Sequence, residues 1–205
     1  MIAEWLCAQL AKEFGLPIAP YALATVPGEL IEADPSGWLK DLGAGAVFAS
    51  QKVNAVELTA THRERVLQSV CQDLLVFDWW VRNGDRTLTE RGGNPDLLWK
   101  HEEDGQLVVI DHNLAFDPDF STEAFRTSHV FADEVPAVFS DFVARSSYKA
   151  RLRKALGVWE QSCAIIPAAW NFVDPEMTIP NAFSLADALL LLQDCEREEF
   201  WSLES

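Results

Sequence analysis

The sequence has no long hydrophobic run, because none of its apolar stretches approaches the roughly 20 residues that a membrane-spanning helix needs. It also has no basic leader before an apolar core at its start, so it does not indicate a secretory signal. We therefore expect a cytoplasmic protein that makes no contact with a membrane. Hydrophobic residues at 49% and charged residues at 23% are ordinary values for a globular domain.

Closely spaced cysteine pairs are absent as well. The four cysteines lie far apart, each within a stretch of helical pattern: Cys7, Cys71, Cys163 and Cys195. Without a Cys-x-x-Cys pair, neither a zinc site nor a disulfide framework is expected. We predict four reduced, metal-free thiols that act as small core residues in a reducing compartment.

Basic residues are scarce. Sixteen Lys and Arg against 32 Asp and Glu give a net charge of −16. This charge opposes close approach to a phosphate backbone, so direct binding of nucleic acid is not expected. The acidic balance would suit a basic protein partner or a mimic of nucleic acid, but a surface that only keeps the chain in solution is the favoured interpretation.

Helical periodicity dominates the pattern of apolar residues. At the start, four of them recur at every fourth position and predict an amphipathic helix: Ile2, Leu6, Leu10 and Phe14. Residues 17–52, which contain several prolines and glycines, are predicted to be irregular with one or two short strands. Thr61 and Glu64 have the spacing of a capping box, and the apolar residues that follow predict one long helix to about Val81.

The second half of the chain combines a short hairpin with further helices. Residues 97–99 and 107–110 are β-type runs around a polar stretch with turn character. Beyond Phe120 the spacing predicts helices at about 133–145, 148–156 and 158–170, and a last helix that Ser184 opens. The pattern therefore predicts an α+β fold that is mainly α-helical, with residues 1–205 in a single domain.

Three polar clusters interrupt this apolar scaffold: Asn-Gly-Asp-Arg at 83–86, Asn-Pro-Asp-Leu-Leu at 94–98, and Ile-Asp-His-Asn-Leu-Ala-Phe at 110–116. Singly, Asp85 or Asn94 indicates only a turn. Asp111 follows a Leu-Val-Val-Ile strand, where a carboxylate projects from the edge of a buried sheet. Together, their order is typical of phosphoryl transfer, which needs one carboxylate to orient the attacking hydroxyl and an Asn and a second carboxylate to hold Mg²⁺.

These segments resemble the HipA-like kinase family. Its catalytic segment reads approximately as an apolar helix, Asn-x-Asp-Arg, Asn-Pro-Asn-Leu-Leu and Ile-Asp-His-Gly-x-Ala-Phe. The resemblance covers residues 1 to about 175, and upstream it includes Glu4, Gly15-Leu16-Pro17 and Phe48-Ala49-Ser50. It implies a protein-kinase-like C-terminal lobe in which the short β-hairpin bears the metal site.

The resemblance also implies roles for individual residues. Asp85 corresponds to the catalytic base, Asn94 and Asp111 to metal ligands, and Glu4 to a cofactor-binding glutamate on the helix that connects the lobes. The implied cofactors are Mg²⁺ and ATP, and the implied reaction is transfer of phosphate to a Ser or Thr hydroxyl of a protein. His112 has no partner at ligand spacing, so an orienting or packing role is expected for it.

The spacing of the loop departs from the kinase pattern. In kinase-type loops the metal-binding Asn stands at the fifth position after the catalytic Asp, whereas Asn94 is the ninth residue after Asp85. Residues 87–93 must then bulge outward for Asn94 to reach the site. Glu90 occupies the fifth position and is the alternative ligand, although Asn94 matches the motif better.

The segments that grip ATP in a kinase, a glycine-rich strand pair and a lysine, precede the helix with which this sequence begins. We therefore expect an incomplete nucleotide site, with weak binding of Mg²⁺-ATP by this chain alone and another chain as one source of the missing lobe. The alternative is a catalytically silent, pseudokinase-type acidic module that binds a protein. A metal-dependent hydrolase that uses Asp85 and Asp111 is a third, less favoured interpretation.

Overall fold

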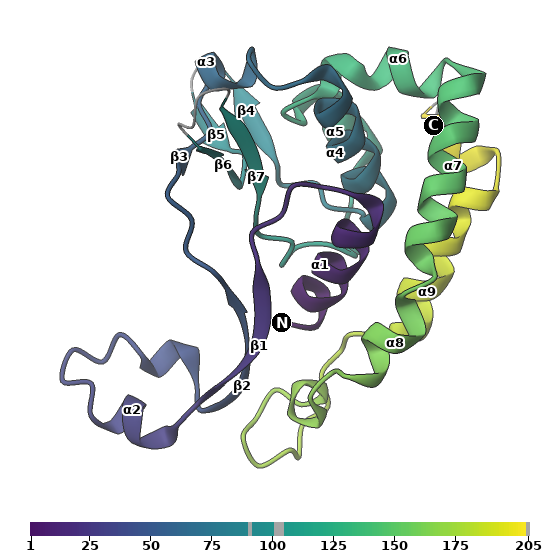
Figure 1. Ribbon diagram of the computed structural model, residues 1–205. Helices are drawn as coiled ribbons and strands as arrows, with labels where there is room; N and C mark the ends of the chain where they lie inside the picture. Colours follow the sequence, from purple (N-terminus) through teal and green to yellow (C-terminus); the bar gives the residue numbers. More distant parts are fainter. Residues whose placement is uncertain (90–91, 101–104, 204–205) are drawn as a thin grey trace.

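The computed structural model describes residues 1–89, 92–100 and 105–203, and Figure 1 shows how their helices and strands are arranged. The helices are α1 (Ile2–Phe14), α2 (Gly28–Glu32), α3 (Ala60–Arg63), α4 (Gln68–Val81), α5 (Thr122–Ser128), α6 (Val135–Phe139), α7 (Phe142–Leu156), α8 (Trp159–Ala164) and α9 (Leu185–Gln193). Short 3-10 turns are η1 (Lys40–Leu42), η2 (Ala132–Glu134), η3 (Ala168–Asn171), η4 (Asp194–Glu196) and η5 (Glu199–Trp201). The predicted α+β fold is confirmed in its mixture of helices and small antiparallel sheets.

The strands form small antiparallel sheets: β1 (Tyr21–Val26) with β2 (Gly45–Ser50), β3 (Val56–Glu57) with β6 (Leu97–Lys100) and β7 (Gln106–Val109), and β4 (Thr87–Thr89) with β5 (Gly92–Asn94). The predicted hairpin is therefore confirmed as β6 and β7, while its turn at 101–104 lies outside the described residues. Figure 1 shows β1 and β2 reaching away from the helices, with α2 at the far end of this arm.

The core is centred on α1 and α4. Leu6 and Leu10 of α1 are fully buried, and so are Leu74 to Phe77 in the second half of α4. Figure 1 shows α7, α8 and α9 covering the side of α1 and α4 that faces away from the β-hairpins. Burial of each large aliphatic or aromatic side chain contributes roughly 1.5–3 kcal/mol, so this helix layer is a substantial source of apolar stabilisation.

Three tryptophans attach this core to the C-terminal helices through backbone carbonyls. The indole N–H of Trp5 donates to Ser162 O at 2.9 Å, and that of Trp80 donates to Leu192 O at 2.8 Å. Trp79 donates to Phe200 O at 3.0 Å. Each hydrogen bond satisfies an indole N–H that burial of the ring removes from water. A buried indole N–H usually has such a partner.

Several sequence-based predictions hold. The helix at the start is α1, and it ends at Gly15, whose φ of 100° is left-handed, as a helix-terminating glycine allows. The last helix is α9, opened by Ser184, whose side chain accepts a hydrogen bond from Asp187 N. The four cysteines are free thiols. None of the helices in the described part of the chain combines the length and the apolar character needed to cross a membrane.

The extent of other elements was predicted wrongly. The proposed capping box at Thr61 and Glu64 does not form, because Thr59 caps the short helix α3 through His62, and α4 starts separately at Gln68. The predicted helix at 133–145 is divided, because the Asp141 carboxylate accepts from Val143 N and Ala144 N and so begins α7. The predicted helix at 158–170 ends with α8 at Ala164, ahead of Pro167.

Residues 17–52 contain two short strands, as predicted, and these strands form a regular ladder. β1 and β2 pair along six residues each, from Tyr21 opposite Ser50 to Val26 opposite Gly45. The glycines and prolines that suggested irregular structure lie mostly in the long connection between these strands, which holds α2 and η1. The ladder is specified by cross-strand pairing, which no local pattern within either strand reveals.

Candidate active site

A buried arginine, Arg86, organises the loop after α4. Its side chain is fully buried, and its Nε lies 3.0 Å from a carboxylate oxygen of Asp78, which is also fully buried. The Nε2 of His129 lies 3.1 Å from the same carboxylate. Because His129 Nδ1 accepts from Phe131 N, its Nε2 carries the proton that is shared with Asp78. We call these residues the buried ion network.

The guanidinium of Arg86 also holds two distant turns of the backbone. One terminal nitrogen donates to Asp96 O at 2.7 Å, and the other donates to Asp111 O at 2.8 Å. Both aspartates have left-handed backbone conformations, with φ of 48° and 55°. Such conformations are uncommon for residues other than glycine and persist where the surrounding structure imposes them. Arg86 therefore fixes both aspartates at the same place.

Asp85, the neighbour of Arg86, completes a group of three carboxylates with Asp96 and Asp111, which we call the carboxylate cluster. Burial, together with the charges of Asp85 and Asp111 and a hydrogen bond shared with Asp85, raises the pKa of Asp96 to about 6. Burial also raises the pKa of Asp85, assisted by Asp78 and Asp111 and opposed by Arg86. The three carboxyl groups are therefore near enough for their charges to act on one another.

Among the described residues, Asn94 contacts the carboxylate cluster through Asp96. Its side chain is exposed, and its Nδ2 donates to Asp96 Oδ2 at 2.9 Å. Between Asp85 and Asn94, β4 and β5 pair with each other from Thr87 opposite Asn94 to Thr89 opposite Gly92, and this ladder takes up the additional residues of the long spacing. A Cβ at Gly93 would lie 2.3 Å from Thr87 O, so only glycine permits this close pairing. Glu90, the alternative ligand, lies outside the described residues.

Glu4 connects α1 to the same site. Its carboxylate accepts a hydrogen bond from His112 N, directly after Asp111. Burial raises the pKa of Glu4, the His112 hydrogen bond opposes this, and the charge of Asp111 adds to the rise. The sequence indicated Glu4 as a cofactor-binding residue. In the structure it lies beside Asp111 and holds the Asp111 turn against α1.

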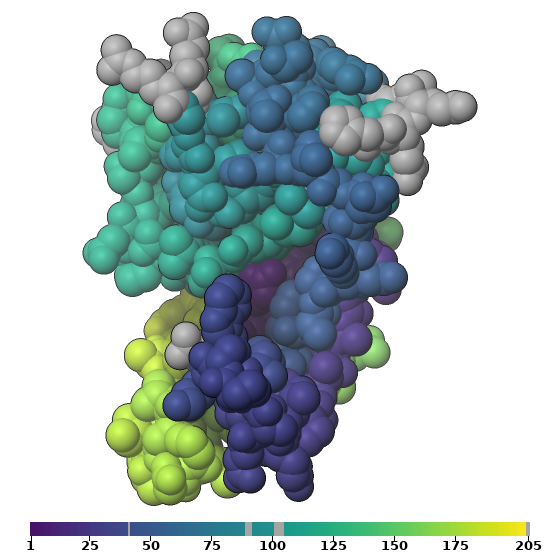
Figure 2. Space-filling model, turned by 90° about the vertical axis from the view of Figure 1, so that its left-hand side faces the viewer, coloured from purple at the N-terminus to yellow at the C-terminus, as the bar shows by residue number. Residues whose placement is uncertain are grey.

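A cavity of about 540 Å³ adjoins this side of the cluster, and its lining includes Glu4, Lys52, Leu98 and Asp111. The residues that connect β2 to β3, Ser50 to Val53, form another part of its wall. Figure 2 shows a hollow on this face of the molecule, with the purple residues of α1 recessed between teal and blue segments. The volume is within the range of small-molecule and cofactor sites.

The donor set suits a hard cation. Carboxylate and amide oxygens of Asp85, Asp96, Asp111 and Asn94 are the ligand type that Mg²⁺ prefers. The Oδ1 atom of Asp85 is buried and has no hydrogen-bond partner among the described residues, and a cation or a substrate hydroxyl would satisfy it. In the described residues, however, no three His, Cys, Asp or Glu side chains are already positioned to hold one ion. The chemistry therefore fits Mg²⁺, and the side chains would have to rotate to bind it.

His112 has the packing role that was expected for it. Its ring is buried with its edge against Phe77, at 5.6 Å between centroids. Burial, aided by the Arg86 charge, lowers the pKa of His112 to about 3, so the ring is neutral near pH 7. Its Nε2 atom has no hydrogen-bond partner among the described residues.

Sequence reasoning identified Asp85 and Asp111, which the structure brings together, but missed Asp96 and Arg86. The signal for Asp96 was present, because it stands directly before Leu97-Leu98, where the family motif has its second Asn. Arg86 appeared only as a letter of the Asn-x-Asp-Arg motif. Its function of holding residues 96 and 111 depends on contacts between segments that are 10 and 25 positions apart.

The fold and the site together define a mainly helical α+β protein with clustered carboxylates at the end of a β-hairpin, beside a cofactor-sized cavity. A model of the HipA-like kinase family matches residues 1–204. Because this match covers nearly the whole chain, the chain belongs to the HipA-like kinase family. No curated protein matches the chain significantly. Family membership supports a kinase-like function in general terms.

Proposed function

We propose that this chain forms the catalytic part of a protein kinase that transfers phosphate from Mg²⁺-ATP to a Ser or Thr hydroxyl of a protein. The observation that carries the proposal is the carboxylate cluster, which shares Asp111 with the 540 Å³ cavity. A cluster of carboxylates concentrates negative charge next to the cavity and so attracts Mg²⁺. A bound Mg²⁺ would in turn attract the phosphates of a nucleotide.

Each residue then has a role that its position supports. Asp85, with its buried and unpaired oxygen, orients the attacking hydroxyl and accepts its proton. Asp96 and Asp111 would hold Mg²⁺, which when bound would neutralise the charge of the triphosphate. Asn94 donates its amide N–H to Asp96, and this contact supports a role for Asp96 as the direct ligand and for Asn94 as the residue that orients it. Glu4 keeps the Asp111 turn in place.

Lys52 is the basic residue that the described lining of the cavity contains. It is exposed, and no described ion pair engages it. A nucleotide in the cavity would bring its phosphates or its ribose edge within reach of this ammonium. We therefore assign Lys52 to nucleotide binding, and Lys52→Met should weaken binding of Mg²⁺-ATP by about fivefold.

The direct test is titration of the 205-residue chain with Mg²⁺-ATP, followed by amide NMR shifts and calorimetry. We expect shifts at Glu4, Lys52 and Ile110, a dissociation constant in the millimolar range, and loss of binding in Asp111→Asn. The weak affinity follows because a kinase draws roughly 4 kcal/mol, about a thousandfold, from its glycine-rich loop and phosphate lysine. Shifts confined to other parts of the molecule would refute the assignment of this cavity.

Phosphoryl transfer itself is tested by incubation with radiolabelled Mg²⁺-ATP and analysis of phosphorylated Ser and Thr. Asp85→Asn should abolish any label while leaving nucleotide binding nearly unchanged, because Asp85 acts on the hydroxyl. Lys40→Met, which alters a lysine far from the cavity on η1, is the control and should retain the label. If the Asp85→Asn variant still incorporated radiolabelled phosphate, Asp85 would not be the catalytic base.

A silent, protein-binding relative is the second candidate. The specific observation in its favour is that no three potential ligand side chains of the described residues are yet placed around one ion. In that case Mg²⁺ would not bind at the carboxylate cluster even at about 10 mM, and ATP would cause no shifts in the cavity. A Mg²⁺ titration monitored at Asp96 and Asp111 distinguishes the two functions.

A further inference from the structure

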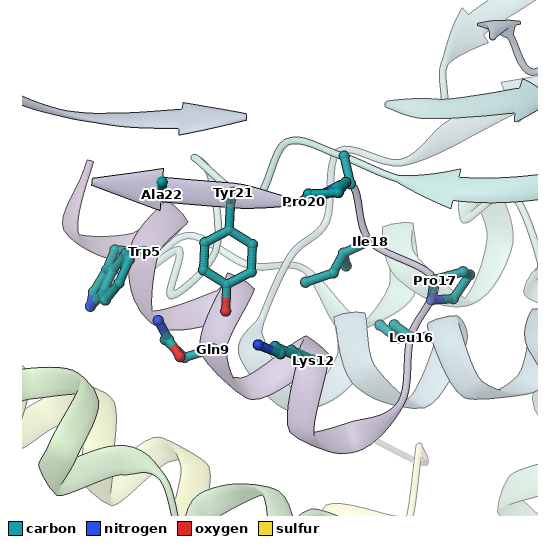
Figure 3. Close-up of a pocket in the computed structure, with 10 residues that line it drawn as sticks. Trp5, Gln9, Lys12, Leu16, Pro17, Ile18, Pro20, Tyr21 and Ala22 are labelled. Atoms are coloured by element: carbon teal, nitrogen blue, oxygen red, sulfur yellow. The ribbon is translucent and has the colours of Figure 1, made fainter. Parts of the chain in front are cut away.

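A second cavity, of about 560 Å³, lies on another side of α1. It is lined by one face of α1 and by the segment that leads from α1 into β1, residues 16–22 (Figure 3). The carboxylate cluster takes no part in it. Ala19 lines both this cavity and the one beside Asp111, so the two cavities are neighbours on either side of this segment.

Three polar side chains converge on the second cavity. Gln9 and Lys12 lie on the same face of α1 because residues three and four positions apart are neighbours on a helix. Tyr21 reaches them from the start of β1. Figure 3 shows its hydroxyl pointing toward α1, between the side-chain ends of Gln9 and Lys12. The cavity therefore presents an ammonium, an amide and a hydroxyl within one small region.

These polar groups are available to a ligand. Among the residues that the structure describes, none of the three forms a hydrogen bond or an ion pair. Glu13, the neighbouring acid on α1, is engaged by Lys154 at 2.8 Å. Burial raises the pKa of Tyr21, so its hydroxyl keeps its proton and can donate at neutral pH.

The rest of the lining is apolar or aromatic. Leu16, Ile18 and the prolines at 17 and 20 form one part of it. The ring of Trp5 forms another part and meets Tyr21 edge to face at 5.9 Å. Because the indole N–H of Trp5 is already used by Ser162 O, this ring offers only an apolar surface. A ligand must therefore have an apolar body and a polar end.

We propose that this cavity binds a small carboxylic acid with an apolar body, whose carboxylate meets Lys12, Gln9 and Tyr21. One ammonium and two neutral donors match the single charge and the two oxygens of a carboxylate. A phosphate dianion would demand more positive charge than the one lysine of this lining supplies. The hydrocarbon part occupies the space beside Leu16, Ile18 and Trp5.

Octanoate is the probe for this proposal, and 1-octanol is its uncharged counterpart. Both are titrated into the isotopically labelled 205-residue chain without nucleotide, so the result does not depend on the proposed kinase function. For about ten non-hydrogen atoms we expect a dissociation constant near 1 mM for octanoate. Shifts should appear at Tyr21, Ile18 and the indole N–H of Trp5, and octanol should bind more weakly.

Variants assign the binding to the polar end of the cavity. Lys12→Met should weaken octanoate binding by about fivefold, and Tyr21→Phe by about twofold to threefold, while octanol binding stays the same. Lys40→Met is the matched control and should change neither. Equal binding of octanoate and octanol, an unchanged affinity in Lys12→Met, or shifts located elsewhere would each overturn the proposal. Circular dichroism of each variant verifies that α1 remains folded.

Discussion

Two groups of charged residues lie almost side by side in this protein and behave in opposite ways. In the buried ion network, Asp78 faces Arg86 and His129, so every charge has a partner of opposite sign or a hydrogen bond. In the carboxylate cluster, by contrast, Asp85, Asp96 and Asp111 face one another. The first arrangement stabilises a fold, and the second gathers like charges that only an added cation or proton can neutralise.

The pKa directions express this difference. Burial by itself would raise the pKa of Asp78, but Arg86 and His129 outweigh it and the net direction is downward. For Asp96, burial and the neighbouring carboxylates act in the same direction and raise the pKa to about 6. Two aspartates that interact with the same arginine thus titrate differently because of what else surrounds them. Clustered, raised carboxyl pKa values are typical of functional sites.

The largest effect is expected when the buried ion network is broken. Arg86→Met should lower the free energy of unfolding by about 3–5 kcal/mol, because it leaves the Asp78 carboxylate buried without its cation. It also releases the backbone of Asp96 and Asp111. Urea denaturation monitored by tryptophan fluorescence measures the change.

Two further variants test the cause of this loss. Asp78→Asn combined with Arg86→Met should regain part of the stability, because no unpaired charge remains in the core. Arg153→Met removes an arginine from an exposed ion pair with Glu196 and should leave the urea midpoint close to that of the wild type. Equal effects of Arg86→Met and Arg153→Met would contradict the distinction between the two regions.

An intermediate effect is expected when a cation is added to the carboxylate cluster. Mg²⁺ at about ten times its dissociation constant should stabilise the wild type by about 1.4 kcal/mol, which corresponds to roughly 3–6 °C in melting temperature. Asp96→Asn should lose most of this response, and Asn94→Ala only part of it. A thermal melt with and without Mg²⁺ measures both. If Asn94→Ala reduced the Mg²⁺-dependent stabilisation as much as Asp96→Asn does, Asn94 would have to be assigned as a direct ligand.

The smallest effect concerns pH. Because the pKa of Asp96 is raised to about 6, its contribution to stability is present below the unfolded-state pKa of about 4 and is lost as the pH rises through about 6. Asp96→Asn should therefore stabilise the protein at neutral pH by at most about 1 kcal/mol, since the group is only half-buried. It should also flatten the stability profile between about pH 4 and 6.

The control for this profile is an aspartate whose pKa moves the other way. Hydrogen bonds from Ser36 and Leu39 lower the pKa of Asp34, so its contribution grows as the pH rises through the acid range. Asp34→Asn should change the slope in the opposite sense to Asp96→Asn. Chemical denaturation at a series of pH values reads both, and a profile unaffected by Asp96→Asn would show that Asp96 is not coupled to its neighbours.

Much of the helical framework was predictable from local pattern. The repeat of apolar residues defined α1 and the buried end of α4 at Val81, and the serine cap defined the start of α9. Where the prediction was wrong, at α3 and α7, the helices are capped by the side chains of Thr59 and Asp141, which the apolar periodicity does not identify as helix starts. The β1 and β2 ladder depended on pairing across a long connection.

The sequence by itself indicated Asp85 and Asp111 as candidate site residues, because they stand in motifs whose composition and order are typical of phosphoryl transfer. Only the tertiary structure decided that Asp96 joins them and that Asn94 lies behind it. The physical reason is that Arg86 gathers the backbone of Asp96 and Asp111 to one point. A guanidinium has several donors in a fixed geometry, so it can bind backbone carbonyls of segments that are distant in the chain. The local periodicity of the sequence does not predict such contacts.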